Sequence, residues 1–204
     1  MNYLVLSPGR SGSVMLARYL AQCLDKEYLH VDVFVSNAKD HVLHVHDVAV
    51  AQKFNEHQIL LVRRSPVEIA ASIMIAKATG IFHFKRDDGD LVNQTTKEEY
   101  IDRYKDQLFD FDMIEYLRLV QTYIDWYISA EDLIPRSIMF DYEEAIDISK
   151  INDKLNLSPN ASTLSLPIAQ PWDKWTKIKN GQAMRAAGEK LLLPYIKRHE
   201  NIFA

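Results

Sequence analysis

The stretch Tyr3-Leu-Val-Leu-Ser-Pro-Gly-Arg-Ser-Gly-Ser-Val-Met-Leu-Ala-Arg18 decides the fold of this chain. Its first four residues form a short apolar run, which is typical of a buried parallel strand. Residues 7–12 are rich in serine, proline and glycine, and this composition predicts a turn. From Ser13 onward apolar residues recur at helical spacing, which predicts a helix that ends near residues 25–27. The sequence therefore predicts a strand, a loop of small residues and a helix in succession.

This order of elements favours the binding of an anion. Backbone N–H groups at a helix N-terminus point outward, and the helix dipole favours negative charge there. Gly12 allows close approach of the backbone, Ser11 and Ser13 add hydroxyl donors, and Arg10 adds a fixed positive charge. We predict a phosphate-binding loop, with a tight turn that binds nothing as the alternative. The loop does not match the Walker pattern, because Gly9 and Gly12 are too close and no lysine follows.

Composition limits the class of protein. A chain of 204 residues that is 48% hydrophobic can bury one sizeable core, so we expect a single domain over residues 1–204. The net charge of −4 argues against a general nucleic-acid surface, which would be basic. The first strand follows Met1 directly and no apolar run is long enough to span a membrane, so we expect a cytoplasmic protein. The oligomeric state stays open.

A second motif follows in His41-Val-Leu-His-Val-His-Asp-Val48, which predicts another strand. Alternation places His44 and His46 on the same face of it. The two imidazoles could be exposed without a function, could bind a metal, or could include a general base, since histidine titrates near neutral pH. A metal would need a third ligand, and the candidates are His41, Asp47 and His57.

A third motif begins with the predicted strand 58–62 and continues through Arg63-Arg-Ser-Pro-Val-Glu-Ile-Ala-Ala-Ser-Ile-Met74. Ser65, Pro66 and Glu68 predict a helix start with a capping box. Arg64 then lies at the carboxyl end of a strand, where open α/β sheets bind their ligands. The alternative is that the two arginines form surface ion pairs and that Ser72 only packs against the sheet.

Weaker patterns describe the rest of the chain. Apolar runs predict strands at 30–35 and 136–144, and periodic apolar residues predict helices within 97–130 and at 147–157. The last helix, 182–199, is expected to be interrupted at Gly188 and Pro194.

Taken together, these motifs resemble the sulfotransferases that use 3′-phosphoadenosine 5′-phosphosulfate (PAPS). The segment Pro8-Gly-Arg-Ser-Gly-Ser13 is similar to the 5′-phosphosulfate loop of that family. The pattern strand-Arg-x-Pro-x-Glu-Ile-Ala-x-Ser is similar to its 3′-phosphate motif, in which Arg64 and Ser72 have the matching spacing and Arg63 falls one position early. In Phe140-Asp-Tyr-Glu-Glu144, Tyr142 takes the position of a tyrosine that lies beside the adenine.

The resemblance also suggests a role for the histidine pair. The family carries Lys-Thr-His at the end of a strand, and its histidine removes the proton of the acceptor. His44-Val-His46 lies where that tripeptide falls. The resemblance therefore implies that His46 is the base and that His44 replaces the lysine of the family. Val14 likewise replaces a residue that often carries a hydroxyl. Nearest to the family's basic C-terminal loop are Lys177 and Lys179.

The resemblance implies an α/β fold, a three-layer sandwich with a mostly parallel central sheet in a P-loop NTPase-like arrangement. It implies transfer of a sulfuryl group from PAPS to a hydroxyl or amine of a small-molecule or glycan acceptor, with 3′,5′-adenosine bisphosphate (PAP) as product and no metal required. Catalytic roles fall on His46 and Arg10, and aromatic residues such as Phe82 and Phe84 are weaker candidates for acceptor contact. The implied cofactor-binding residues are Arg10, Ser11, Gly12, Ser13, Val14, Arg64, Ser72 and Tyr142.

Two other functions stay open at this point. One is an ATP-dependent phosphotransferase with magnesium, although no Walker lysine follows Gly12 and only Asp47 and Asp141 come near the place of a metal-binding aspartate. The other is a non-catalytic relative that keeps the nucleotide pocket, which the changes at His44 and Val14 would suit.

Overall fold

The computed structural model describes residues 2–31, 40–82, 95–157 and 173–203. The chain divides into two compact units. The first comprises Met1–Arg64, Asp125–Leu166 and His199–Ala204, and the second comprises Ser65–Ile124 and Pro167–Arg198. The single domain expected over residues 1–204 stays a prediction, and Phe84 lies outside the described residues.

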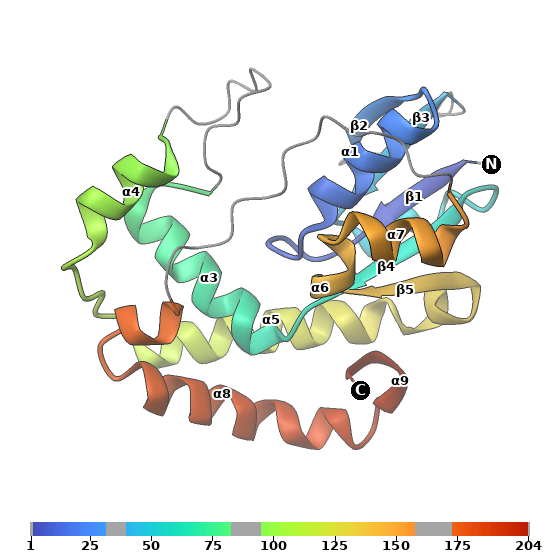
Figure 1. Cartoon of the computed structure of the whole chain (residues 1–204). Helices are drawn as coiled ribbons and strands as arrows, with labels where there is room; N and C mark the ends of the chain where they lie inside the picture. The colour runs from blue at the N-terminus through green and yellow to red at the C-terminus, as the bar shows by residue number, and fades with distance from the viewer. Residues whose placement is uncertain (1, 32–39, 83–94, 158–172, 204) are drawn as a thin grey trace. The chain divides into compact units, whose positions relative to one another are not determined.

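The first unit is built on a five-stranded sheet in which every neighbouring pair is parallel (Figure 1). In sheet order the strands are β2, β3, β1, β4 and β5. Their bounds are β1 (Tyr3–Leu6), β2 (Glu27–Val31), β3 (His41–Val45), β4 (Gln58–Arg63) and β5 (Ser137–Asp141). The central strand β1 is buried along its whole length, as its unbroken apolar run predicts.

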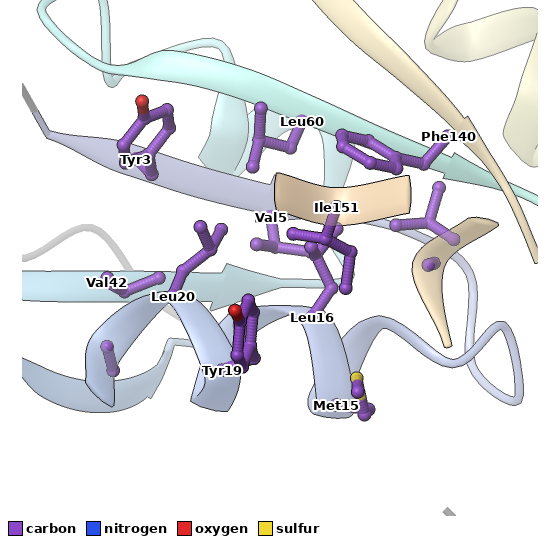
Figure 2. Packing of buried hydrophobic residues seen from close by; sticks show 14 residues of the cluster. Tyr3, Val5, Met15, Leu16, Tyr19, Leu20, Val42, Leu60, Phe140 and Ile151 are labelled. Carbon is purple, nitrogen blue, oxygen red and sulfur yellow. The ribbon is translucent and has the colours of Figure 1, made fainter. Parts of the chain in front are cut away.

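One face of this sheet is covered by α1 (Ser13–Cys23), α6 (Tyr142–Ala145) and α7 (Ile148–Leu155). Figure 2 shows Leu16 and Leu20 pointing from α1 toward Val5 and Val42 of the sheet. All four side chains are fully buried, and burial of each such side chain contributes about 1.5–3 kcal/mol. The helical spacing read from the sequence is therefore the spacing that packs α1 on the sheet.

The other face is covered by α2 (Val48–Ala51), by the end of α5 (Met113–Ser129) and by the 3₁₀ turn η1 (Glu131–Arg136). Leu4 and Leu61 point to this side and pack in a cluster with Phe54 and Leu133. With helices on both faces of a parallel sheet, the expected α/β three-layer sandwich is confirmed. Its central β1, followed by a loop and α1, gives the P-loop NTPase-like arrangement.

The second unit is helical over its described residues. Its elements are α3 (Pro66–Thr79), α4 (Lys97–Tyr104), most of α5, η2 (Lys174–Lys177) and α8 (Gly181–Ile196), whereas α9 (Glu200–Phe203) belongs to the first unit. The expected interruption of the last helix is wrong, because α8 runs unbroken through Gly188 and Pro194. No helix in the described ranges is both long enough and apolar enough to cross a membrane. The cytoplasmic location stays a prediction.

Glu68 corrects the expected capping box at the start of α3. The helix begins at Pro66 after Ser65, but the Ser65 side chain makes no capping hydrogen bond. Glu68 instead accepts from Lys174 Nζ at 2.5 Å and from Trp175 Nε1 at 2.9 Å. Both carboxylate oxygens are thus used to hold η2 against α3.

Gly188 marks the closest approach of α8 to its neighbours. A Cβ at this position would lie 2.4 Å from the Tyr116 hydroxyl oxygen and 3.1 Å from Val67 Cγ2. The Tyr116 hydroxyl is buried and has no hydrogen-bond partner among the described residues. Glycine is therefore needed here for space.

We predict that Gly188→Ala destabilises the protein by about 1–3 kcal/mol, because the added methyl group overpacks the contact with Tyr116. The same change in an exposed helix would stabilise by about 1 kcal/mol. Removal of the clashing oxygen in Gly188→Ala/Tyr116→Phe should restore part of the loss. Urea unfolding measures the three variants, and a Gly188→Ala protein that is as stable as wild type contradicts the packing.

Candidate active site

The candidate site lies in the first unit, along the carboxyl edge of the sheet. Because the strands are parallel, their carboxyl ends meet at this edge, where α/β proteins bind their ligands. The loop 7–12 follows β1, His46 follows β3, Arg64 follows β4 and Tyr142 follows β5. Four of the segments singled out in the sequence therefore leave the same edge. Ser72 is 2% exposed and lies on α3 in the second unit, so its role stays a prediction.

The loop after β1 has an unusual backbone. Arg10 and Gly12 both have positive φ angles, of 63° and 79°. Arginine seldom adopts this left-handed conformation, and such local strain is concentrated at functional sites. Gly12 has a second constraint, because a Cβ there would lie 2.8 Å from Ile146 Cγ2 and 3.3 Å from Tyr142 Cδ2. The glycine is thus needed both for its φ and for space.

Two hydroxyl groups in this loop are buried. Ser7 and Ser11 are fully buried, and neither Oγ has a hydrogen-bond partner within the described residues. An unsatisfied buried hydroxyl costs about 1–3 kcal/mol. Oxygen atoms of a bound anion would accept from these donors, so the loop has the chemistry of an anion site.

The N-terminus of α1 adds backbone donors to the loop. Gly12 is the N-cap, and no side chain caps the helix there. The N–H groups of the first helical residues, Ser13 and Val14, have no carbonyl of the preceding turn to bond to. An anion at this position would therefore receive backbone hydrogen bonds as well as the helix dipole.

Arg64 brings a positive charge to the same loop. Its Nη1 donates to the backbone oxygen of Arg10 at 2.5 Å. Its guanidinium carbon lies 4.2 Å from the centre of the Tyr142 ring, which is a cation–π contact. The Tyr127 hydroxyl accepts from the Arg64 N–H at 2.8 Å and donates to the Arg64 oxygen at 2.9 Å. Burial raises the pKa of Tyr127, which keeps the hydroxyl neutral and able to do both.

The two neighbouring arginines, Arg63 and Arg64, make different contacts. Arg63 Nε and Nη2 lie 3.0 and 2.9 Å from Asp141 Oδ1, and its Nη1 donates to the backbone oxygen of Ile202. Arg63 is therefore engaged in holding β4 to β5 and the C-terminal helix. Of the two arginines, Arg64 is the one in contact with the loop.

His46 is oriented by the loop. Its Nδ1 lies 2.7 Å from the backbone oxygen of Ser7, and a carbonyl can only accept, so Nδ1 carries the hydrogen. The lone pair of the neutral ring is therefore on Nε2. Trp126 Nε1 donates to the backbone oxygen of His46 at 2.6 Å. A shallow hollow beside these residues is lined by His46, Asp47, Val48, Ala49, Gln52, Trp126 and Ser129.

His44 lies behind the loop rather than at its surface. It is fully buried, its Nε2 is 2.8 Å from Ser13 Oγ, and its Nδ1 is 3.2 Å from the Tyr28 hydroxyl. It therefore acts on the loop through Ser13.

A third histidine, His30, was not identified from the sequence. It lies on β2 directly opposite His44, and the two rings stack at 4.9 Å. The His46 ring lies 5.1 Å from that of His30 and 4.5 Å from that of His44. Only the register of β2 on β3 brings His30 here, and one strand's pattern does not contain that register.

Most of the other residues singled out in the sequence contact groups outside this cluster. His41 Nε2 contacts Glu27 at 3.1 Å, and the Asp47 carboxylate accepts from two backbone N–H groups as the N-cap of α2. In the second unit Lys179 pairs with Asp110 at 3.0 Å and Lys177 Nζ donates to the backbone oxygen of Lys105. Phe82 is 40% exposed.

No protein-family model matches the chain, and no curated protein does. Among solved structures the chain is similar to a sulfotransferase from Alicyclobacillus acidocaldarius, with a TM-score of 0.43 and 16% identity over 97% of this chain and 96% of that one. A function for this chain therefore depends on its own residues and contacts.

We predict that Gly12→Ala destabilises the protein by about 1–3 kcal/mol, because it forces a side chain into a left-handed conformation and against Ile146. Gly9→Ala is the matched control, since a Cβ there would have no atom within 4 Å and the φ is not left-handed. Urea unfolding should separate the two variants. Equal midpoints would show that the loop does not have this conformation.

Proposed function

We propose that this protein transfers a sulfuryl group from PAPS to a hydroxyl or amine of a small-molecule or glycan acceptor and releases PAP. The observation that carries the proposal is the contact between the Arg64 guanidinium and the backbone of the loop after β1. It joins a fixed positive charge to a loop that precedes a helix and has two buried hydroxyls with no partner among the residues that the structure describes. Such a combination suits a ligand with anionic groups at two places.

The residues of this edge fit the two ends of PAPS. Ser11, Ser13 and the amide groups of Gly12 and Val14 would hold the 5′ end, together with Arg10. Arg64 would hold the ribose 3′-phosphate, and Tyr142 would lie beside the adenine. The role expected for Ser72 stays a prediction, because Ser72 belongs to the second unit. PAPS supplies the activated sulfuryl group, so the protein's part is to position, to neutralise charge and to accept a proton.

His46 is proposed as the general base. Because Ser7 fixes its tautomer, the Nε2 lone pair takes the proton of the acceptor hydroxyl or amine. Arg10 and the N–H groups at the start of α1 neutralise the negative charge that grows on the phosphate end. The hollow beside His46, which Trp126 helps to line, is where the acceptor would approach.

The contacts of two aspartates disfavour the magnesium-dependent alternative. Asp47 is used as the N-cap of α2, and Asp141 pairs with Arg63. The two carboxylates considered for a metal-bound nucleotide are thus both engaged within the protein. A nucleotide-binding protein without turnover is the second candidate, because His44 replaces a lysine of the family and is buried behind Ser13.

We predict that PAP binds and stabilises the protein more than ADP with magnesium does. Arg64→Ala should weaken PAP binding about 10- to 150-fold, since a charge-assisted hydrogen bond contributes about 1.5–3 kcal/mol. Arg136→Ala is the matched control, because Arg136 precedes β5 at the opposite edge of the sheet and contacts Asn55. Calorimetric titration measures each affinity, and tighter binding of ADP with magnesium would contradict the proposal.

We predict that radiolabelled PAPS transfers its label to an acceptor in a mixed panel, and that His46→Ala slows transfer about 10²–10⁴-fold while PAP still binds. His41→Ala, at the first residue of the strand that His46 follows, should transfer normally. Binding of PAP with no transfer to any class of acceptor would favour the protein without turnover.

A further inference from the structure

Three histidines from two strands form a cluster that the proposed reaction does not use as a whole. They are exposed His30 on β2, buried His44 on β3 and half-buried His46 directly after β3. We propose that His30, His44 and His46 bind a divalent transition metal, Zn²⁺ above all, and that bound metal blocks the transfer reaction. The second half of this proposal rests on the proposed function; the first half does not.

The distances suit a metal site. Each histidine offers one ring nitrogen, and these three atoms all lie within 4.8 Å of one another. Zinc binds imidazole nitrogen at about 2.0–2.1 Å, so two nitrogens of a tetrahedral site are about 3.4 Å apart. Binding would therefore draw the nitrogens closer together, and His30 is the one exposed side chain of the three. Three protein nitrogens would leave a fourth position for water, as in open zinc sites.

His46 already makes the kind of hydrogen bond that a metal-bound histidine makes. Such histidines usually donate their second ring N–H to a carbonyl or carboxylate, which fixes the ring. His46 Nδ1 donates to the backbone oxygen of Ser7 at 2.7 Å, so Nε2 is the nitrogen that offers a lone pair.

His44 can offer either ring nitrogen to a metal while its other ring nitrogen keeps a hydrogen-bond partner. If Nδ1 binds the metal, the Nε2 hydrogen is donated to Ser13 Oγ at 2.8 Å. If Nε2 binds it, the Nδ1 hydrogen is donated to the Tyr28 hydroxyl at 3.2 Å. Both partners are hydroxyls, which accept as readily as they donate.

The donor set selects the kind of metal. The cluster found among the described residues contains three imidazoles and no carboxylate. The nearest acidic side chain in sequence, Asp47, is occupied at the start of α2. Imidazole suits Zn²⁺, Co²⁺, Ni²⁺ and Cu²⁺, whereas Mg²⁺ and Ca²⁺ require oxygen ligands.

A metal ion bound to the three histidines would prevent His46 from acting as the base. The proposed transfer needs the Nε2 lone pair of His46 to take a proton, and the metal would hold the same lone pair. No bond to substrate is formed or broken by this step. The metal therefore acts as an inhibitor of the proposed reaction, and its removal by a chelator restores activity.

The test uses the untagged full-length chain after treatment with a chelator. Titration with Zn²⁺ by calorimetry should give one site, and Co²⁺ should give the visible absorption of a four-coordinate site. His30→Ala should weaken Zn²⁺ binding at least about tenfold. The matched control is His41→Ala, which removes another histidine of β3 from a pair with Glu27 and should leave Zn²⁺ binding unchanged.

The results separate the two halves of the proposal. Absence of one-to-one binding, or equal binding by His30→Ala and His41→Ala, overturns the metal site. Transfer by the wild type that Zn²⁺ does not inhibit, although it binds, overturns the inhibitory role. Inhibition that occurs in wild type and is relieved in His30→Ala supports both. Zn²⁺ binding that depends on His30, in a protein that transfers no label, supports the site while the proposed function fails.

Discussion

The hydrogen bond from the Arg64 guanidinium to the backbone oxygen of Arg10 is the contact on which the site depends. It is possible because β1 and β4 are neighbours in the sheet, with Leu6 opposite Leu61. The loop after β1 and the residue after β4 therefore leave the sheet side by side. A parallel sheet with β1 at its centre thus brings two motifs, 54 residues apart in the chain, to one place.

The surrounding contacts hold this arrangement at some cost in stability. Ser7 and Ser11 have buried hydroxyls with no partner in the described part of the chain, and Arg10 has a left-handed backbone. Natural sequences place such departures where a function requires them. The strand β1 is fully buried, and hydrophobic clusters pack on both faces of its sheet. This packing holds the loop after β1 in place. A bound anion would satisfy the two hydroxyls.

The sequence predicted those parts that depend on local pattern. The strand, loop and helix at residues 3–23 follow from composition and spacing over a short window, and the structure has them. The same holds for β4 and the start of α3, where Pro66 takes the first helical position. The arginine that contacts the loop is the one at the predicted spacing, Arg64.

Contacts between residues far apart in the chain could not be predicted from local sequence patterns. Glu68 has the position of a capping residue, but Lys174 and Trp175, more than a hundred residues later, take its carboxylate. His30 reaches His44 only through the register of β2 on β3. The expected break at Gly188 failed for a related reason, because that glycine makes room for Tyr116 and does not end the helix. In each case a partner from another element decided the outcome.

A crystal structure of the complex with PAP tests the central claim most directly. We expect the 5′-phosphate to accept hydrogen bonds from Ser11 and from the N–H groups at the start of α1, and the 3′-phosphate to contact the Arg64 guanidinium. A PAP molecule bound away from the carboxyl edge of the sheet would contradict the claim. A complex in which Arg64 still contacts Arg10 and does not contact a phosphate would also contradict it.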